Sequence, residues 1–195
     1  MREPTDPTRP TAPTAPAPAG PPGEAATGGG PAGLVVRTAE VAEYPAIGRL
    51  TVDAYVAGGH LDGDSDYLRA LGDPASRTAG CDLLAATDRT GRLVGSVVFV
   101  HPESDQREVA APDEGEIRML AVAPDAQGAG VGTALVGACL DRARAAGYRA
   151  VALCVIRSNE GAHRLYRRFG FVRTPERDWE PNPVVPLLAY RLALA

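Results

Sequence analysis

A glycine-rich segment in the second half of the chain is placed where it could bind a phosphate group. It lies between two apolar segments, the first with the pattern of a strand and the second with that of a helix. At such a junction free backbone N–H groups and the positive end of the helix dipole attract an anion. A glycine-rich turn without a ligand explains the spacing equally well. The segment consists of Gln127, Gly128, Ala129, Gly130, Val131, Gly132 and Thr133.

Two other nucleotide-binding patterns fit this segment less well. The dinucleotide fingerprint has a third glycine three residues after the second, and Thr133 occupies that position after Gly130. The phosphate loop of NTPases requires Gly-Lys followed by Ser or Thr, which this segment lacks. A dinucleotide-dependent oxidoreductase is therefore disfavoured.

Residues 122–135 resemble the acetyl-coenzyme A (acetyl-CoA) signature of the GNAT acetyltransferase superfamily. That signature is Arg or Gln, two residues, Gly, one residue, and then Gly or Ala. Gln127, Gly130 and Gly132 fill it in this chain.

A second segment matches the other GNAT motif, Asn-x-x-Ala-x-x-x-Tyr. Asn159, Ala162 and Tyr166 occupy its fixed positions, and the Gly-Phe pair at 170–171 is the pair that usually follows. The two motifs stand in the expected order. The elements expected upstream also follow the superfamily order of strand, helix pair, hairpin and strand, so the resemblance covers about residues 34–195.

The resemblance implies an α/β fold with a mixed central sheet of six to seven strands and about four flanking helices. In this fold two parallel strands splay apart and form the acetyl-CoA cleft, and residues 116–122 and 150–155 would be those strands. The pantetheine arm would pair with the backbone of one strand as though it were an added strand, and residues 127–133 would bind the pyrophosphate. The implied pantetheine contacts are Leu120, Ala121 and Val122, and Asn159 completes the expected cofactor-binding set.

A carboxylate is expected on the acceptor side of the cleft. An acceptor ammonium must lose a proton, directly or through water, before its nitrogen can attack a thioester. Residues 116–122 are similar to the corresponding strand of histone-acetylating GNAT enzymes, in which the glutamate at the place of Glu116 is the general base. Glu114 shares the same face if the strand extends upstream. For both side chains the alternative is a solvated position in the loop of residues 103–116.

Tyr166 is expected to protonate the leaving group. A phenol, with an ordinary pKa of about 10, can donate a proton to the departing thiolate. The alternative is a packing role, because Ala162, Leu165 and Phe169 make the same helix largely apolar. The match of Asn159 and Ala162 to the motif favours the catalytic role.

Cys154 limits the choice of substrate. Bacterial enzymes that acetylate the N-termini of ribosomal proteins resemble this chain in the strand before the second motif, but they carry a glutamate where the Leu-Cys-Val sequence of residues 153–155 has its cysteine. That substrate class is therefore not favoured. Cys154 is not expected to act as a nucleophile, because no histidine lies near it in either motif and mid-strand thiols are usually buried.

Three weaker signals are interpreted as structural. Aspartates at 62, 64 and 66 have the initial spacing of a calcium loop, but Tyr67 stands where that loop needs glycine. Trp179 is expected at the edge of the core rather than in an acceptor pocket. No metal is expected, because the three histidines share no ligand spacing; they are His60, His101 and His163.

Hydrophobic periodicity predicts an alternation of strands and helices. The strands are expected at residues 34–37, 82–87, 93–100, 116–122, 150–155, 171–173 and 185–194, and the helices at 46–57, 67–71, 130–146 and 160–169. The order of strand, helix and strand after residue 116 implies a parallel pair.

The composition divides the chain into two parts. Residues 1–33 contain half of the prolines and almost no large apolar side chain, which predicts a disordered tail. Residues 34–195 are then a single acetyltransferase domain. A formal net charge of −4 disfavours nucleic acid as a partner.

The function expected from these observations is transfer of an acetyl group from acetyl-CoA to a primary amine of a small molecule, peptide or protein, by direct attack in a ternary complex. The alternative is a GNAT-like acetyl-CoA-binding regulatory or interaction module without catalysis. Widely spaced cysteines, odd in number, and the lack of a long apolar segment favour a cytoplasmic protein without a membrane span. It is expected to be a monomer or a homodimer.

Overall fold

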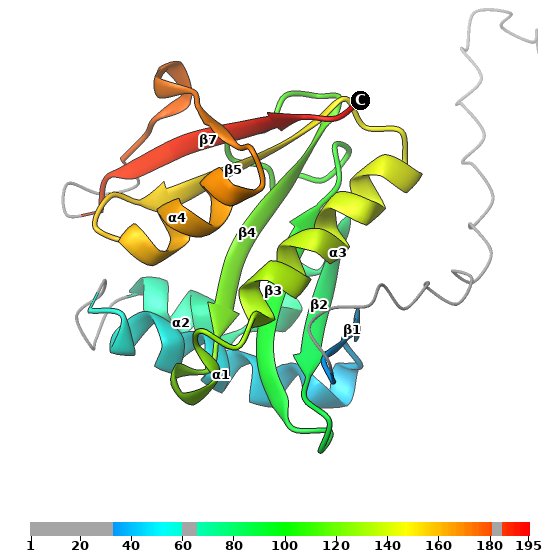
Figure 1. The fold of residues 1–195 in the computed structure, drawn as a ribbon, viewed down its shortest axis with the longest axis vertical. Helices are drawn as coiled ribbons and strands as arrows, with labels where there is room; N and C mark the ends of the chain where they lie inside the picture. The colour runs from blue at the N-terminus through cyan, green and yellow to red at the C-terminus, as the bar shows by residue number, and fades with distance from the viewer. Residues whose placement is uncertain (1–32, 60–65, 181–184) are drawn as a thin grey trace, which may run out of the picture.

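A computed structural model describes residues 33–59, 66–180 and 185–195. Nearly all of the predicted tail, His60 and the aspartates at 62 and 64 lie outside these ranges. The described residues form a single seven-stranded sheet with helices on both of its faces (Figure 1).

The expected elements are all present in this part of the chain, with boundaries that differ by a few residues. The strands are β1 (Val35–Thr38), β2 (Cys81–Thr87), β3 (Leu93–Val100), β4 (Glu114–Val122), β5 (Ala150–Ile156), β6 (Val172–Arg173) and β7 (Leu187–Ala193). The helices are α1 (Tyr44–Ala57), α2 (Asp66–Gly72), α3 (Val131–Ala145) and α4 (Glu160–Arg168).

The sheet has the order β1-β2-β3-β4-β5-β7-β6. Only β4 and β5 pair in parallel, and α3 connects them, as the order of elements predicted. All other neighbouring strands are antiparallel.

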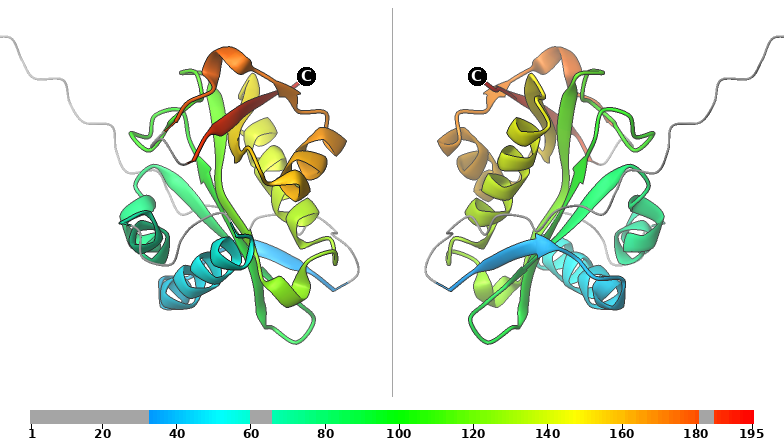
Figure 2. Two further views of the ribbon diagram at one scale, coloured as in Figure 1. Left: turned by 90° about the vertical axis from the view of Figure 1, so that its left-hand side faces the viewer. Right: turned by 90° about the vertical axis from the view of Figure 1, so that its right-hand side faces the viewer.

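Each face of the sheet has its own apolar core. The helices α1 and α2 lie on one face, and α3 and α4 on the other (Figure 2). Side chains of β3 alternate between the two cores, since Phe99 packs with the α3 side and Val98 and Val100 pack with Ile47 of α1. This alternation follows from the two-residue period of a strand and fixes which residues of the neighbouring β4 face each helix pair.

The parallel strands part in the middle of the sheet. Hydrogen-bonded pairing of β4 with β5 ends at Ile117 and Leu153, although both strands continue beyond these residues. On the other edge of β4, Met119 and Leu120 together lie opposite a single residue of β3, which is a β-bulge. Met119 has a φ of 50°, a left-handed conformation that is unusual for a residue other than glycine. A bulge bends the strand that carries it, so β4 turns away from β5 and the expected splay is present.

Candidate functional site

A cavity of about 850 Å³ begins where β4 and β5 part. Its walls come from the second half of β4, the end of β5, the helix α4, and the facing sides of α1 and α2. This volume is in the range of pockets that bind cofactors or small substrates. The walls of the cavity come from segments that are far apart in the sequence. A ligand in the cavity would therefore contact most of the elements that contain the expected site residues.

One end of the cavity contains most of the residues expected to bind the cofactor. The edge of β4 that faces β5 is unpaired beyond Ile117, so its backbone N–H and C=O groups are open to a ligand. Cavity-lining residues from the expected set are Leu120, Ala121, Val122, Gln127, Gly128 and Asn159. Asn159 has a structural task as well, because its side-chain oxygen accepts the Ala162 N–H at 3.0 Å and caps α4.

The start of α3 offers the backbone donors that a phosphate needs. Gly128 and Gly130 have φ angles of 80° and 85°, which only glycine adopts readily. No side chain caps α3. Within the described residues, the amide N–H groups of residues 130–133 have no protein acceptor, whereas the Ala129 N–H is bonded to the Ala126 carbonyl at 3.3 Å.

Five of the expected cofactor residues lie beside the cavity rather than in its wall. They are Ala129, Gly130, Val131, Gly132 and Thr133. The Val131 side chain is buried in the core, so this residue can contribute only its amide. A Cβ atom on Gly132 would lie 3.1 Å from Cδ2 of Leu165, so α4 packs closely on the first turn of α3.

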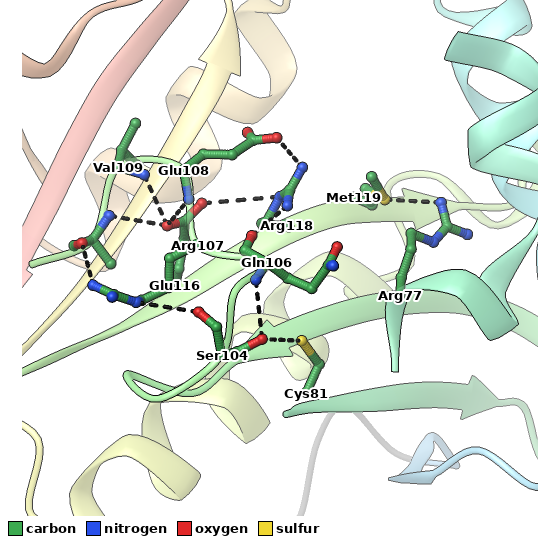
Figure 3. A network of polar contacts seen from close by, with 11 residues as sticks. Arg77, Cys81, Ser104, Gln106, Arg107, Glu108, Val109, Glu116, Arg118 and Met119 are labelled. Atoms are coloured by element: carbon green, nitrogen blue, oxygen red, sulfur yellow. Dashed lines mark hydrogen bonds and ion pairs between the residues drawn. The ribbon is translucent and has the colours of Figure 1, made fainter. Parts of the chain in front are cut away.

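Glu116 also lines the cavity, and it is buried rather than solvated. The residue is only 1% exposed, which rules out the alternative of a solvated loop position. Its Oε2 accepts the backbone N–H groups of Glu108, Val109 and Ala110 at 2.9–3.0 Å (Figure 3). Glu116 therefore holds the loop between β3 and β4 against the sheet. Its other oxygen, Oε1, lies 3.9 Å from Nε of Arg118.

Glu108 and Arg118 lie next to Glu116 and also line the cavity, and neither was expected from the sequence. Glu108, Glu116 and Arg118 together form the polar wall of the cavity. Arg118 donates to the Glu108 carboxylate and, at 2.5 Å, to the Gln106 carbonyl (Figure 3). Burial raises the pKa of Glu108, and the attraction of Arg118 offsets this only in part. No motif marks Glu108. Its approach to the cavity results from the three N–H bonds to Glu116, which join residues six to eight positions apart.

β4 begins at Glu114, so the strand extends upstream of Glu116, which was the condition for the two side chains to share a face. Glu114 does not line the cavity. It is 2% exposed, so the solvated alternative is wrong here too. Arg177 donates to it at 2.5 Å, the Ala111 amide at 3.0 Å and Arg191 at 2.6 Å. Burial favours the protonated acid, but these donors outweigh it and lower the pKa of Glu114 to about 2.

Tyr166 is packed in the core and also reaches the cavity. It is 5% exposed and its ring packs edge to face against Phe171, with centroids 5.6 Å apart. It also lines the cavity. Burial raises the pKa of its phenol, which therefore stays protonated at neutral pH.

Other cavity residues come from outside both motifs. Cys154 lines the cavity, and burial raises the pKa of its thiol to about 12, so a thiolate nucleophile is disfavoured. Trp179 also lines the cavity, so the expected place at the core edge describes its position only in part. Tyr55 and Tyr67 meet edge to face at 6.4 Å and form the wall contributed by α1 and α2.

The described histidines have protein partners. His101 Nδ1 lies 2.8 Å from the Tyr148 hydroxyl, and His163 Nδ1 lies 2.9 Å from the Tyr190 hydroxyl. In the described ranges no three His, Cys, Asp or Glu side chains are grouped as metal ligands. None of the helices in these ranges has the length and the apolar character that a membrane span requires.

Comparison with known families gives the site a context. Residues 44–171 match the model of the acetyltransferase (GNAT) family. The chain belongs to this family. Among solved GNAT structures it is similar to a GCN5-related N-acetyltransferase from Kribbella flavida, with 26% identity and a TM-score of 0.63 over 84% of this chain and 99% of that one. A putative acetyltransferase from Salmonella typhimurium, solved with its cofactor acetyl-CoA, shares the fold at 23% identity and a TM-score of 0.61 over 84% of this chain and 95% of that one.

Curated relatives of this GNAT chain are named mycothiol acetyltransferase. The protein from Sanguibacter keddieii is 37% identical over 142 residues, which is 73% of this chain and 40% of the relative. The protein from Cellulomonas flavigena is 45% identical over 89 residues, which is 45% of this chain and 26% of the relative. The matched region thus spans less than half the length of these relatives.

The buried Glu114 of this GNAT fold predicts a specific acid sensitivity. Because its pKa falls from an ordinary 4.5 to about 2 on folding, its contribution to stability is complete above about pH 4.5 and is lost as the pH falls toward 2. The loss is on the order of 3 kcal/mol. Urea unfolding between pH 7 and pH 2 should show this slope in the wild type, and Glu114→Gln should flatten it and lower the free energy of unfolding at pH 7.

The exposed Glu103, in the loop between β3 and β4, provides the control. Glu103→Gln should keep the wild-type slope. An unchanged slope in Glu114→Gln would show that the two arginine contacts do not govern acid unfolding.

Proposed function

We propose that this GNAT chain is an acetyl-CoA-dependent N-acetyltransferase that acts on a primary amine of a small molecule, peptide or protein by direct attack in a ternary complex. One observation carries the proposal. A single cavity connects the unpaired edge of β4 and the glycine segment with the buried phenol of Tyr166 and the carboxylates of Glu108 and Glu116. A phosphate-bearing thioester and an amine would meet in this space. The domain that performs the reaction extends over residues 34–195.

The donor set fits acetyl-CoA. Residues 120–122 present backbone groups that an extended amide-containing chain can pair with, as an added strand would. The four unbonded N–H groups of residues 130–133 and the dipole of α3 suit a pyrophosphate. Acetyl-CoA, when bound, supplies the thioester that the amine attacks.

The acceptor side supplies a proton acceptor and a proton donor. The acceptor ammonium gives one proton to the Glu116 carboxylate, through Oε1 directly or by way of a water, and the free amine then attacks. The carbon–sulfur bond breaks as the carbon–nitrogen bond forms, and the Tyr166 hydroxyl gives its proton to the sulfur. Tyr166 then regains the proton that the new amide nitrogen loses, so the products are the acetylamide, CoA thiol and one proton. Burial keeps Tyr166 protonated, which suits a donor.

The acceptor is an amine, and the mycothiol acetyltransferase relatives give the first compounds to screen. We further propose that the enzyme acts in the cytoplasm as a monomer or homodimer. Cys81, Cys139 and Cys154 are free thiols in the structure, which suits a reducing compartment.

Cofactor binding is tested with Thr133→Glu. This exposed residue is in the first turn of α3, where a carboxylate stabilises the helix but repels a pyrophosphate. Calorimetry should show saturable acetyl-CoA binding by the wild type, at least about tenfold weaker binding by Thr133→Glu, and near wild-type binding by Thr133→Gln. NADH should not bind. Absence of acetyl-CoA binding by the wild type would refute the proposed function.

Tyr166→Phe tests the proton donor. Phenylalanine keeps the packing against Phe171 but removes the hydroxyl, so the fold and the acetyl-CoA affinity should be unchanged. The kcat for a primary amine, followed by CoA release, should fall by about 10²- to 10⁴-fold. Acetyl-CoA binding without turnover of any amine by the wild type would instead indicate a non-catalytic binding module.

Glu116→Gln tests the proton acceptor. Glutamine keeps one oxygen for the three N–H groups of residues 108–110, so the loop should stay in place while the charge is lost. We expect kcat/KM to fall by about 10²- to 10⁴-fold, with an unchanged melting temperature. Glu108→Gln, measured beside it, should have the smaller effect. The reverse order would assign the proton transfer to Glu108.

A further inference from the structure

We propose that Arg164 and Arg168 of α4 bind the 3′-phosphate of acetyl-CoA. The inference rests on the proposed function and deepens it by naming the residues that would recognise the nucleotide end of the cofactor. Neither arginine belongs to a motif in the sequence.

The two arginines share one face of α4. They are four residues apart, which is about one helical turn, so their side chains project in the same direction. Both line the cavity that also contains Gln127 and Gly128 of the glycine segment. Arg167 is in the same last turn of the helix as Arg168 but does not line the cavity. The face of α4 that carries Arg164 and Arg168 is therefore the face turned toward the proposed cofactor.

This face lies next to the expected pyrophosphate site. Leu165, between the two arginines, is the side chain that packs over Gly132, at 3.1 Å from the position of a Cβ atom there. Gly132 is in the first turn of α3, where the unbonded amides are. Arg164 and Arg168 are thus one and three residues from the side chain that joins α4 to the start of α3. In the cofactor, the 3′-phosphate is separated from the pyrophosphate by a single ribose.

The charges of these arginines are uncompensated. Within the described residues, neither guanidinium has an ion pair or a hydrogen bond, in contrast with Arg118 and its partner Glu108. Glu160 is one turn before Arg164 and also lines the cavity, yet the two side chains form no ion pair. Both arginines are exposed, so no burial penalty accompanies their free charge. They remain available to an anion that enters the cavity.

A phosphate monoester suits this pair. It carries a charge of about −1.5 to −2 at pH 7 and three acceptor oxygens. A guanidinium matches it with two parallel N–H donors. Because the site is exposed, each arginine should contribute a moderate and salt-dependent part of the affinity.

The test compares acetyl-CoA with 3′-dephospho-acetyl-CoA by calorimetry at fixed salt, using the full chain. The wild type should bind acetyl-CoA about tenfold or more tightly than the dephospho compound. Arg164→Gln and Arg168→Gln should each weaken acetyl-CoA binding by about three- to tenfold and leave dephospho binding within about twofold. The double variant should bind both compounds alike.

Arg167→Gln is the matched control, since it removes an exposed arginine from the same last turn of α4. It should change neither affinity, and its melting temperature should match that of Arg168→Gln. Equal weakening of both compounds by Arg164→Gln and Arg168→Gln would overturn the assignment to the 3′-phosphate, as would equal binding of both by the wild type. If the wild type binds neither compound, the proposed function fails, and the subsite with it.

Discussion

β4 and β5 are hydrogen-bonded to each other only as far as Ile117 and Leu153, and the cavity begins where that bonding ends. A strand edge inside a protein normally has to find partners for its backbone groups. Here the bulge at Met119 and Leu120 keeps β4 paired with β3 while it bends away from β5. The sheet thus remains continuous and still presents an open edge in its centre. The glycine segment, α4 and the polar wall are all arranged around that edge.

The two acidic residues of β4 have different partners and different structural roles, although they are close together in the strand. Glu114 and Glu116 are two residues apart, share a face of the strand and are both buried. Glu114 meets two arginines from the C-terminal part of the chain and joins that part to the sheet. Glu116 accepts three backbone amides of the preceding loop through one oxygen, and its other oxygen lies 3.9 Å from Nε of Arg118. Glu114 therefore joins two parts of the chain, whereas Glu116 holds a loop and also lines the cavity.

Sequence reasoning predicted the parts of the molecule that depend on local pattern. Alternation and helical spacing located every described strand and α-helix but not the short 3-10 helices, and the glycine pattern located the start of α3. It could not predict that Glu116 holds a loop, because the partners are backbone amides and any sequence supplies those. The Glu108–Arg118 pair was missed for a related reason, since the contact crosses from a loop without a motif to a strand. Trp179 reaches the cavity only through the path of the chain before β7.

The close approach of Leu165 to Gly132 gives the last residue of the acetyl-CoA signature a packing role in addition to the expected ligand role. The final position of that signature accepts only glycine or alanine, and here a Cβ atom would stand 3.1 Å from the movable end of Leu165. A methyl group could be accommodated by a displacement of a few tenths of an ångström, whereas a longer side chain would push α4 away from α3. The residue therefore sets how closely α4 can approach the first turn of α3. A residue type that is usually explained by ligand binding is thus also required by the packing of α4 against α3.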